Sequence, residues 1–173
     1  MCRKKKFTSC IICASLILFI GGSMSICASS LIPLSAQATK RDFNKNYSDI
    51  VIVTNYFLDS EYSYINVWNT SESGTMFTGL ETGKVKIDDS QVIASISTLF
   101  KRGYSVIRKT DDAIYFQRST RGTDFGSGVV YSADSKTFGI ENLTRIEALS
   151  IDKWYYYESD FNVYKSKKKG FSP

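Results

Sequence analysis

Histidine and cysteine, the side chains that most often carry acid–base and nucleophilic chemistry, are nearly absent from this chain. The sequence has no histidine, and its four cysteines all lie near the N-terminus, at Cys2, Cys10, Cys13 and Cys27. From residue 39 onward there is no thiol nucleophile, no thiolate or imidazole metal ligand and no Ser-His-Asp triad. We therefore expect no metal site and no cofactor.

Carboxylates are the main acid–base groups that remain. Glu158 and Asp160 stand two residues apart in a strand-like segment, so both would lie on one face of a sheet. A pair of carboxylates is the catalytic unit of glycosidases, which makes a carboxylate-dependent hydrolase one alternative. Charged residues at a sheet edge are far commoner, so we expect a binding protein rather than an enzyme.

The same segment is rich in aromatic side chains, in the run WYYYESDF at residues 154–161. In a strand, Trp154 and Tyr156 would point to one face of the sheet and Tyr155 and Tyr157 to the other. We expect one pair in the core: Trp154 and Tyr156 or, as the alternative, their opposite-face neighbours. The second pair, Tyr155 and Tyr157, is the leading candidate for an exposed binding surface, because aromatic rings bury a large area at low entropic cost.

Residues 153–160, KWYYYESD, resemble the core of choline-binding cell-wall repeats. The chain has a single copy and carries Phe161 where those repeats have a glycine. The resemblance implies binding of cell-wall polymer, as an alternative to binding a protein. A basic tail at residues 165–173 could assist at an anionic wall or lipid surface, through Lys165, Lys167, Lys168 and Lys169.

A glycine-rich stretch, RSTRGTDFGSG at residues 118–128, is the second candidate binding segment. Backbone N–H groups of such a loop can face an anion, and arginine suits phosphate or carboxylate, so Arg118, Arg121 and Asp124 are candidate residues. No Walker sequence and no G-x-S-x-G elbow is present. The alternative is a long connection between two strands.

The N-terminus reads as a secretory signal peptide at residues 1–38. A basic start (MCRKKK) precedes an apolar run at residues 11–20. An A-x-A cleavage motif follows, with Ala36 and Ala38 as its two small residues. We expect cleavage after Ala38 and secretion, with retention at the cell surface as a variant. Two alternatives stay open: cleavage after Ala28, or an uncleaved N-terminal membrane anchor, the only case in which we expect membrane contact.

Removing this leader changes the charge of the chain. The net charge of +5 includes four basic leader residues, so residues 39–173 hold 18 basic and 17 acidic side chains. A chain so nearly neutral gives no reason to expect nucleic acid as a partner. We expect an unknown protein or a cell-wall polymer instead.

The elements that position these residues follow from periodicity. We expect a flexible lead-in at 39–47 and one α+β domain at 48–164, with a helix over 48–60, whose β-branched run leaves a strand as the alternative, and a second helix over 88–103. Strands are predicted at 62–68, 75–80, 84–87, 128–132, 143–149 and 153–159, and a hairpin of two strands at 104–119 with its turn at Asp111 and Asp112. Both helices would pack on one face of an antiparallel sheet. Because YSYI (62–65) recurs as YSVI (104–107), two tandem units of one helix and three strands are an alternative description.

Overall fold

The computed structural model describes residues 35–79, 83–121, 125–134, 138, 142–160 and 162, with the side chains of residues 119–121 and 125 left out. By internal contacts the chain divides between residues 32 and 33, and every described residue belongs to the second unit. The body of the predicted leader, residues 1–34, therefore lies outside the described residues, as does residue 163 onward.

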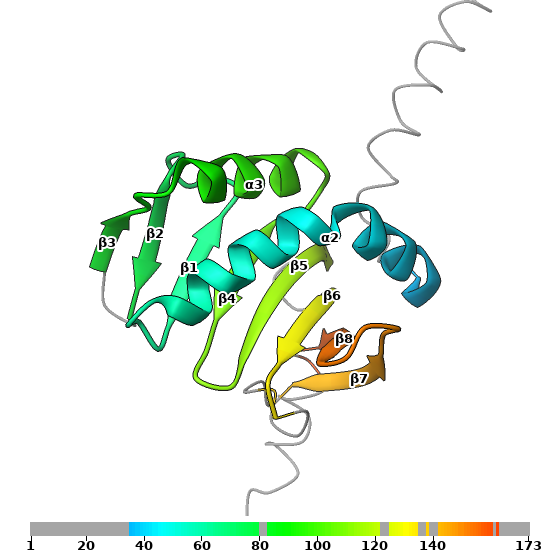
Figure 1. The fold of residues 1–173 in the computed structure, drawn as a ribbon. Helices are drawn as coiled ribbons and strands as arrows, with labels where there is room; N and C mark the ends of the chain where they lie inside the picture. The colour runs from blue at the N-terminus through cyan, green and yellow to red at the C-terminus, as the bar shows by residue number, and fades with distance from the viewer. Residues whose placement is uncertain are drawn as a thin grey trace, which may run out of the picture. The chain divides into compact units, whose positions relative to one another are not determined.

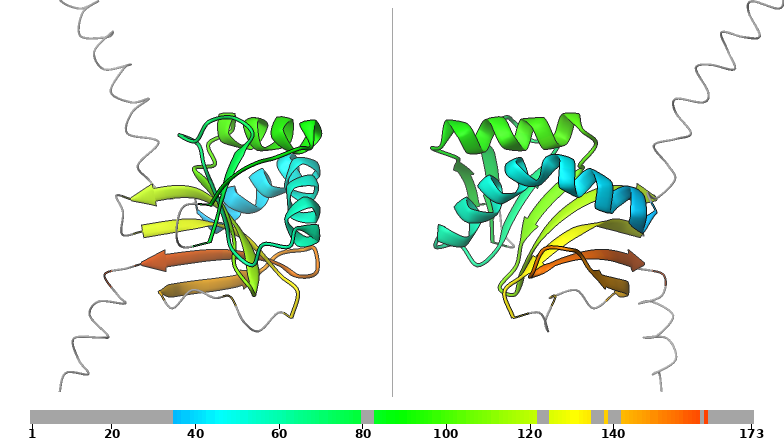
Figure 2. Two further views of the ribbon diagram at one scale, coloured as in Figure 1. Left: turned by 90° about the vertical axis from the view of Figure 1, so that its left-hand side faces the viewer. Right: turned by 45° about the vertical axis from the view of Figure 1, so that its right-hand side comes forward.

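The described chain forms two helices and one sheet of eight strands (Figure 1). The elements in chain order are α2 (Ala36–Asp59), β1 (Ile65–Trp68), β2 (Thr75–Thr78), β3 (Gly83–Lys86), α3 (Ser90–Lys101), β4 (Val106–Lys109), β5 (Ala113–Arg121), β6 (Phe125–Ser132), β7 (Leu143–Ala148) and β8 (Trp154–Asp160). The sheet order is β3-β2-β1-β4-β5-β6-β8-β7, and every neighbouring pair is antiparallel. Figure 2 shows both helices on the same side of the sheet. The predicted α+β class is confirmed.

The first helix begins earlier than the sequence predicts. Residues 39–47, expected to be a flexible lead-in, lie inside α2, which is capped where the Ser35 hydroxyl accepts a hydrogen bond from the Ala38 N–H at 3.3 Å. Phe43 is buried, and its ring centroid lies 5.1 Å from that of Trp154. The prediction was wrong because the contacts that bury this polar stretch come from β8, far away in sequence.

The predicted cleavage motif also falls in this helix. Ala36 and Ala38 both lie in the first turn of α2. The structure does not bear on whether the chain is cut there, and cleavage after Ala38 stays a prediction.

The second helix matches its prediction closely. Asp89 caps α3, since its side chain accepts hydrogen bonds from the N–H groups of Gln91 and Val92, at 2.7 and 3.2 Å. At the other end Gly103 takes a φ of +95°, a conformation that glycine adopts without strain. Val92, Ile96 and Leu99 form the stripe that faces the core.

Six of the eight strands are arranged in the two-unit form that the sequence raised as an alternative. β1 pairs with β4, and from this pair β1-β2-β3 runs outward on one side and β4-β5-β6 on the other, while β8 and β7 extend the sheet beyond β6. Each run follows a helix. Ile65 of β1 and Ile107 of β4 both lie fully buried beneath the helices.

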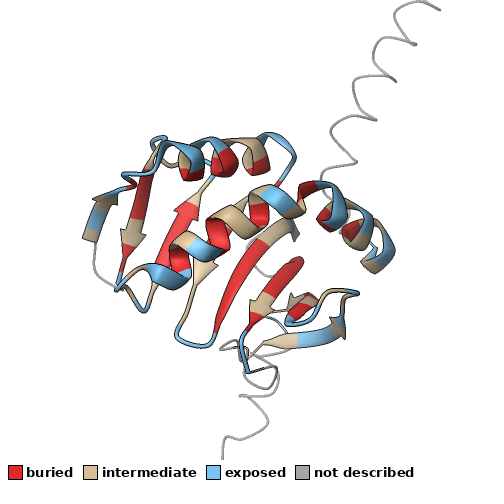
Figure 3. Ribbon diagram, in the orientation of Figure 1, coloured by how far each residue is buried: buried red, intermediate tan, exposed pale blue. Residues whose placement is uncertain are grey.

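The main core lies between the helices and the sheet. It joins Phe43, Ile50 and Phe57 of α2 to Phe116 of β5 and Trp154 of β8. Burial of this kind is the main stabilising contribution to the fold. Figure 3 shows buried residues along the inner side of both helices and on the central strands, whereas β3 and β7 at the sheet edges are half-buried or exposed.

Candidate functional site

The face of the sheet away from the helices carries two rows of side chains that run across the strands. Because side chains alternate along a strand, the register assigns each residue to a face. One row runs Lys84, Phe77, Asn66, Arg108, Tyr115, Val130, Tyr155 and Ala148. The second runs Trp68, Val106, Gln117, Gly128, Tyr157 and Ile146.

Over β5, β6 and β8 this face is closed by a second, smaller core. Tyr157 is 2% exposed and its ring packs edge-on against Tyr115, with centroids 5.2 Å apart. Tyr155 is half-buried and meets Phe138 at 5.2 Å. The predicted direction of these two tyrosines is correct, but the expectation of exposure is wrong for Tyr157.

The cause is packing within and above the sheet. Gly128, the cross-strand partner of Tyr157, has no side chain, and an added Cβ there would meet the Phe116 carbonyl oxygen at 2.1 Å. The Tyr157 ring packs in a cluster with Tyr115 and Val130, and Phe138 and Leu143 pack on the same cluster. On the opposite face Trp154 and Tyr156 are buried, as predicted. The segment that resembles choline-binding repeats thus has three of its four aromatic rings buried.

Over β1 to β4 the same face is more open, and we call its side chains Tyr64, Trp68, Phe77, Lys84, Lys86 and Arg108 the cationic aromatic face. Trp68 and Phe77 are half-buried and form an edge-to-face pair with centroids 4.9 Å apart. Lys84 and Lys86 are exposed on the edge strand β3. The register places both lysines on the same side of the sheet as Phe77 and Arg108.

Asn66 links β1 to its neighbour β4 on this face. Its side chain is nearly buried, at 5% exposure for the residue, and its Nδ2 donates to the Tyr64 hydroxyl at 2.6 Å. Its Oδ1 accepts a hydrogen bond from Arg108 Nε at 2.9 Å. Both polar atoms of a buried amide are thereby satisfied, and the guanidinium group is held at a fixed orientation.

Acidic residues in the strands lie on the other face. Glu147, Glu158 and Asp160 share the side of Trp154 and Tyr156, toward the helices. In the strands that the structure describes, no aspartate or glutamate shares the side of the cationic aromatic face. The two faces of the sheet therefore differ in charge.

The two carboxylates proposed for a hydrolase are already engaged. Glu158 accepts a hydrogen bond from the Tyr156 hydroxyl at 2.7 Å and faces Arg145 at 3.3 Å. Asp160 accepts from the backbone N–H of Asn162 at 2.8 Å. Burial, followed by the bond to Glu158, raises the pKa of Tyr156. Among the described residues, no three Asp, Glu, His or Cys side chains are grouped so that they could hold a metal ion.

The structure separates the predicted site residues. Arg118 lies on the helix side, where it pairs with Asp42 of α2 and its guanidinium carbon sits 5.4 Å from the Tyr104 ring centroid. It cannot share a surface with Tyr155 and Tyr157. The Arg121 side chain, Asp124 and the tail lysines (Lys165, Lys167, Lys168 and Lys169) lie outside the described residues.

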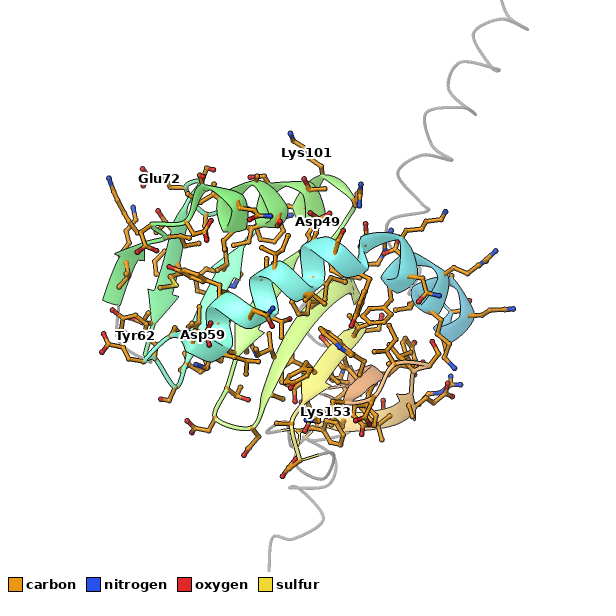
Figure 4. The ribbon with its side chains drawn as sticks, in the orientation of Figure 1. Asp49, Asp59, Tyr62, Glu72, Lys101 and Lys153 are labelled. Carbon is orange, nitrogen blue, oxygen red and sulfur yellow. The ribbon has the colours of Figure 1, made fainter. Side chains whose placement is uncertain are left out.

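Two cavities flank the helix layer, and neither gathers a catalytic set. One of about 190 Å³ lies between the β1–β2 turn and α3, with Glu72 at its rim. The other, a shallow groove of about 330 Å³, lies beyond the end of α2 and is bordered by Asp59 and Tyr62. Figure 4 shows Glu72 near the upper end of the strands on the left of the sheet, and Tyr62 with Asp59 near the lower end of the same strands.

The cationic aromatic face was missed in the sequence, although one signal was present. In YSYINVW the even positions Tyr62, Tyr64 and Trp68 are aromatic, while the odd positions Ile65 and Val67 are aliphatic. That alternation indicates an aliphatic core face and an aromatic outer face. Which residues of β2, β3 and β4 lie beside these aromatic side chains depends on the strand register, which this alternation does not give.

No protein-family model, no curated protein and no solved structure gives a significant match to this chain. In the part of the chain that the structure describes, neither helix combines the length and apolar character needed to cross a membrane.

Proposed function

We propose that this protein is a secreted, non-enzymatic binding protein that engages an acidic protein partner through its cationic aromatic face. The observation that carries the proposal is the segregation of side chains on the sheet. Trp68 and Phe77 share this side of the sheet with three cations, and the described strand carboxylates are on the opposite side. Lys84 is paired with Glu72 of the β1–β2 turn at 2.7 Å, whereas Lys86 and Arg108 form no ion pair with a described carboxylate.

The chemistry of this face is that of a protein interface. Tryptophan and arginine are the side chains most enriched among residues that dominate binding energy, and they act best at the centre of a patch. Trp68 lies on β1 and Arg108 on the neighbouring strand β4, both away from the edge strands β3 and β7. Lysines at the rim contribute mainly to the rate and selectivity of association with an acidic surface.

A binding role is also supported by the chemistry that is missing from the sequence. Residues 39–173 contain neither histidine nor cysteine. The candidate acid Glu158 is held by an arginine and a tyrosine, which favours a structural role for it.

The test is affinity capture from culture medium and from cell-surface extract, with wild-type protein and two variants. Trp68→Ala should abolish capture of the partner, and Lys86→Glu should weaken it. Lys101→Glu makes the same charge change as Lys86→Glu at an exposed residue of α3. It is the matched control and should leave capture intact. Equal capture by wild type, Trp68→Ala and Lys86→Glu would remove the face from consideration.

A second candidate function is association with anionic cell-wall polymer, favoured by the row of cations at Lys84, Lys86 and Arg108. Co-sedimentation with isolated cell walls at low and high salt tests it. If the protein pellets at both salt concentrations and Trp68→Ala does not pellet, the result would support wall binding through the aromatic residues. Pelleting only at low salt would indicate electrostatic attraction alone.

A further inference from the structure

We propose that Arg108 is an oxyanion-binding residue that takes a carboxylate group of an acidic polypeptide segment. This inference rests on the proposed function, because it names the chemical group of the partner that the cationic aromatic face receives. Its evidence is the way Arg108 is held, the absence of a carboxylate beside it and the character of its surroundings.

The guanidinium of Arg108 is oriented before any ligand arrives. Its Nε donates to Asn66 Oδ1 at 2.9 Å, and Asn66 is itself held by the hydrogen bond to Tyr64. A fixed arginine loses less conformational entropy when it binds than a free one does. Asn66 is therefore a positioning residue for this site.

The remaining donors of Arg108 are available. Among the described residues no side chain or carbonyl group accepts a hydrogen bond from its two terminal nitrogens, and no carboxylate lies within ion-pair distance. Arg102, Arg118 and Arg145 differ, because each pairs with a described aspartate or glutamate. Arg108 is half-buried, so its charge is partly removed from water without a protein partner to compensate it.

Aromatic rings surround this charge. Tyr115 is its direct neighbour on β5, and the Tyr115 hydroxyl is buried with no hydrogen-bond partner in the described part of the molecule. Burial, followed by the negative charge of Asp112, raises the pKa of Tyr115, burial raises that of Tyr157, and the charge of Arg108 opposes the rise in each. An anion that docks on Arg108 meets a half-buried charge, and a charge pair there is stronger than one in open water.

A carboxylate fits the free side of the guanidinium. The planar fork of arginine matches the two oxygens of a carboxylate and forms two parallel hydrogen bonds. Phosphate offers similar oxygens, so the experiment must separate the two sources.

The test is a titration of the full-length protein followed by NMR, with the side-chain N–H signals of Arg108 as the readout. A short synthetic oligoglutamate peptide and inorganic phosphate are the two probes. Arg108→Gln should weaken peptide binding about tenfold or more, the loss expected for a charge-assisted bond. Arg102→Gln removes an equal charge on the helix side and should leave the affinity unchanged.

Arg108→Lys keeps the charge but not the fork, and should bind the peptide more weakly than wild type. This variant also tests the site if Arg108→Gln does not fold. Equal peptide affinity in wild type and Arg108→Lys, or equal loss in Arg108→Gln and Arg102→Gln, would overturn the inference. Binding of phosphate alone at Arg108 would overturn the assignment to a carboxylate.

The proposed function can survive that failure. If partner capture still requires Trp68 while Arg108→Gln captures normally, the oxyanion site is wrong and the interface stands. If capture is independent of Trp68 and of Lys86, the proposed function itself fails.

Discussion

Alkaline pH is expected to unfold this protein because buried tyrosines, three of them besides Tyr156, resist ionisation in the native state. Tyr104, Tyr115 and Tyr157 are each 2% exposed. Burial is the main cause that raises the pKa of each above the ordinary value of 10.0. In the unfolded chain the same hydroxyls ionise near that ordinary value.

The sign of the effect follows from proton binding. Below pH 10 both states keep these protons, so the contribution to stability is fully present. Above pH 10 the unfolded state loses protons that the native state retains, and the free energy of unfolding falls. Each tyrosine lowers it by up to about 1.4 kcal/mol per pH unit, and the three together by about 4 kcal/mol per pH unit.

Single domains have free energies of unfolding of about 5–15 kcal/mol. A domain at the lower end of this range would therefore unfold little more than one pH unit above the ordinary tyrosine pKa. The assay pairs denaturant midpoints measured across alkaline pH with tyrosinate absorbance in the near ultraviolet. We expect the tyrosinate signal of the buried group to rise together with loss of the fold, not before it.

The matched variant is Tyr157→Phe, which removes one hydroxyl from the second core. The dependence of stability on pH should become shallower by about 1.4 kcal/mol per pH unit. The reasoning is refuted if all tyrosines ionise near pH 10 while circular dichroism still reports the native fold.

Three further predictions concern stability and are read from denaturant unfolding. Gly128→Ala should lower the free energy of unfolding by about 3 kcal/mol or more, because the new Cβ would lie 2.1 Å from the Phe116 carbonyl oxygen. An unchanged denaturant midpoint would contradict the close approach of β5 and β6. Lys109→Met should lower the free energy of unfolding by about 1.5 kcal/mol or more, because Lys109 Nζ donates a hydrogen bond at 3.1 Å to the Ser60 carbonyl oxygen at the end of α2. Ser35→Ala should cost about 1 kcal/mol as a lost helix cap, and no effect on the secreted protein would indicate that the leader is cut after this position.

Local patterns in the sequence were sufficient for several parts of the fold. The stripe of Val92, Ile96 and Leu99 and the glycine at 103 predicted α3, and both its caps lie within one turn of the expected positions. Alternation in residues 154–157 correctly predicted that Trp154 faces the core. These features depend on periodicity within one segment, which a chain carries without reference to its neighbours.

The start of α2 was predicted too late. Residues 39–47 are mostly polar, but Phe43 and Tyr47 stand seven and three residues before Ile50, at helical spacing, and their ring centroids lie 5.3 Å apart. The burial of Phe43 also depends on the ring of Trp154, which follows more than a hundred residues later. A segment that looks solvated can be helical when a distant strand supplies the surface that it covers.

The sequence by itself determined the chemistry available to this protein: no histidine, no cysteine after residue 27, and strands whose alternate positions are aromatic. Only the tertiary structure decided which of those aromatic residues reach solvent. Pairing of β1 with β4 puts Asn66 beside Arg108, and the second core closes over Tyr157. The physical reason is that periodicity is a property of one strand, whereas exposure depends on register and on what other segments cover.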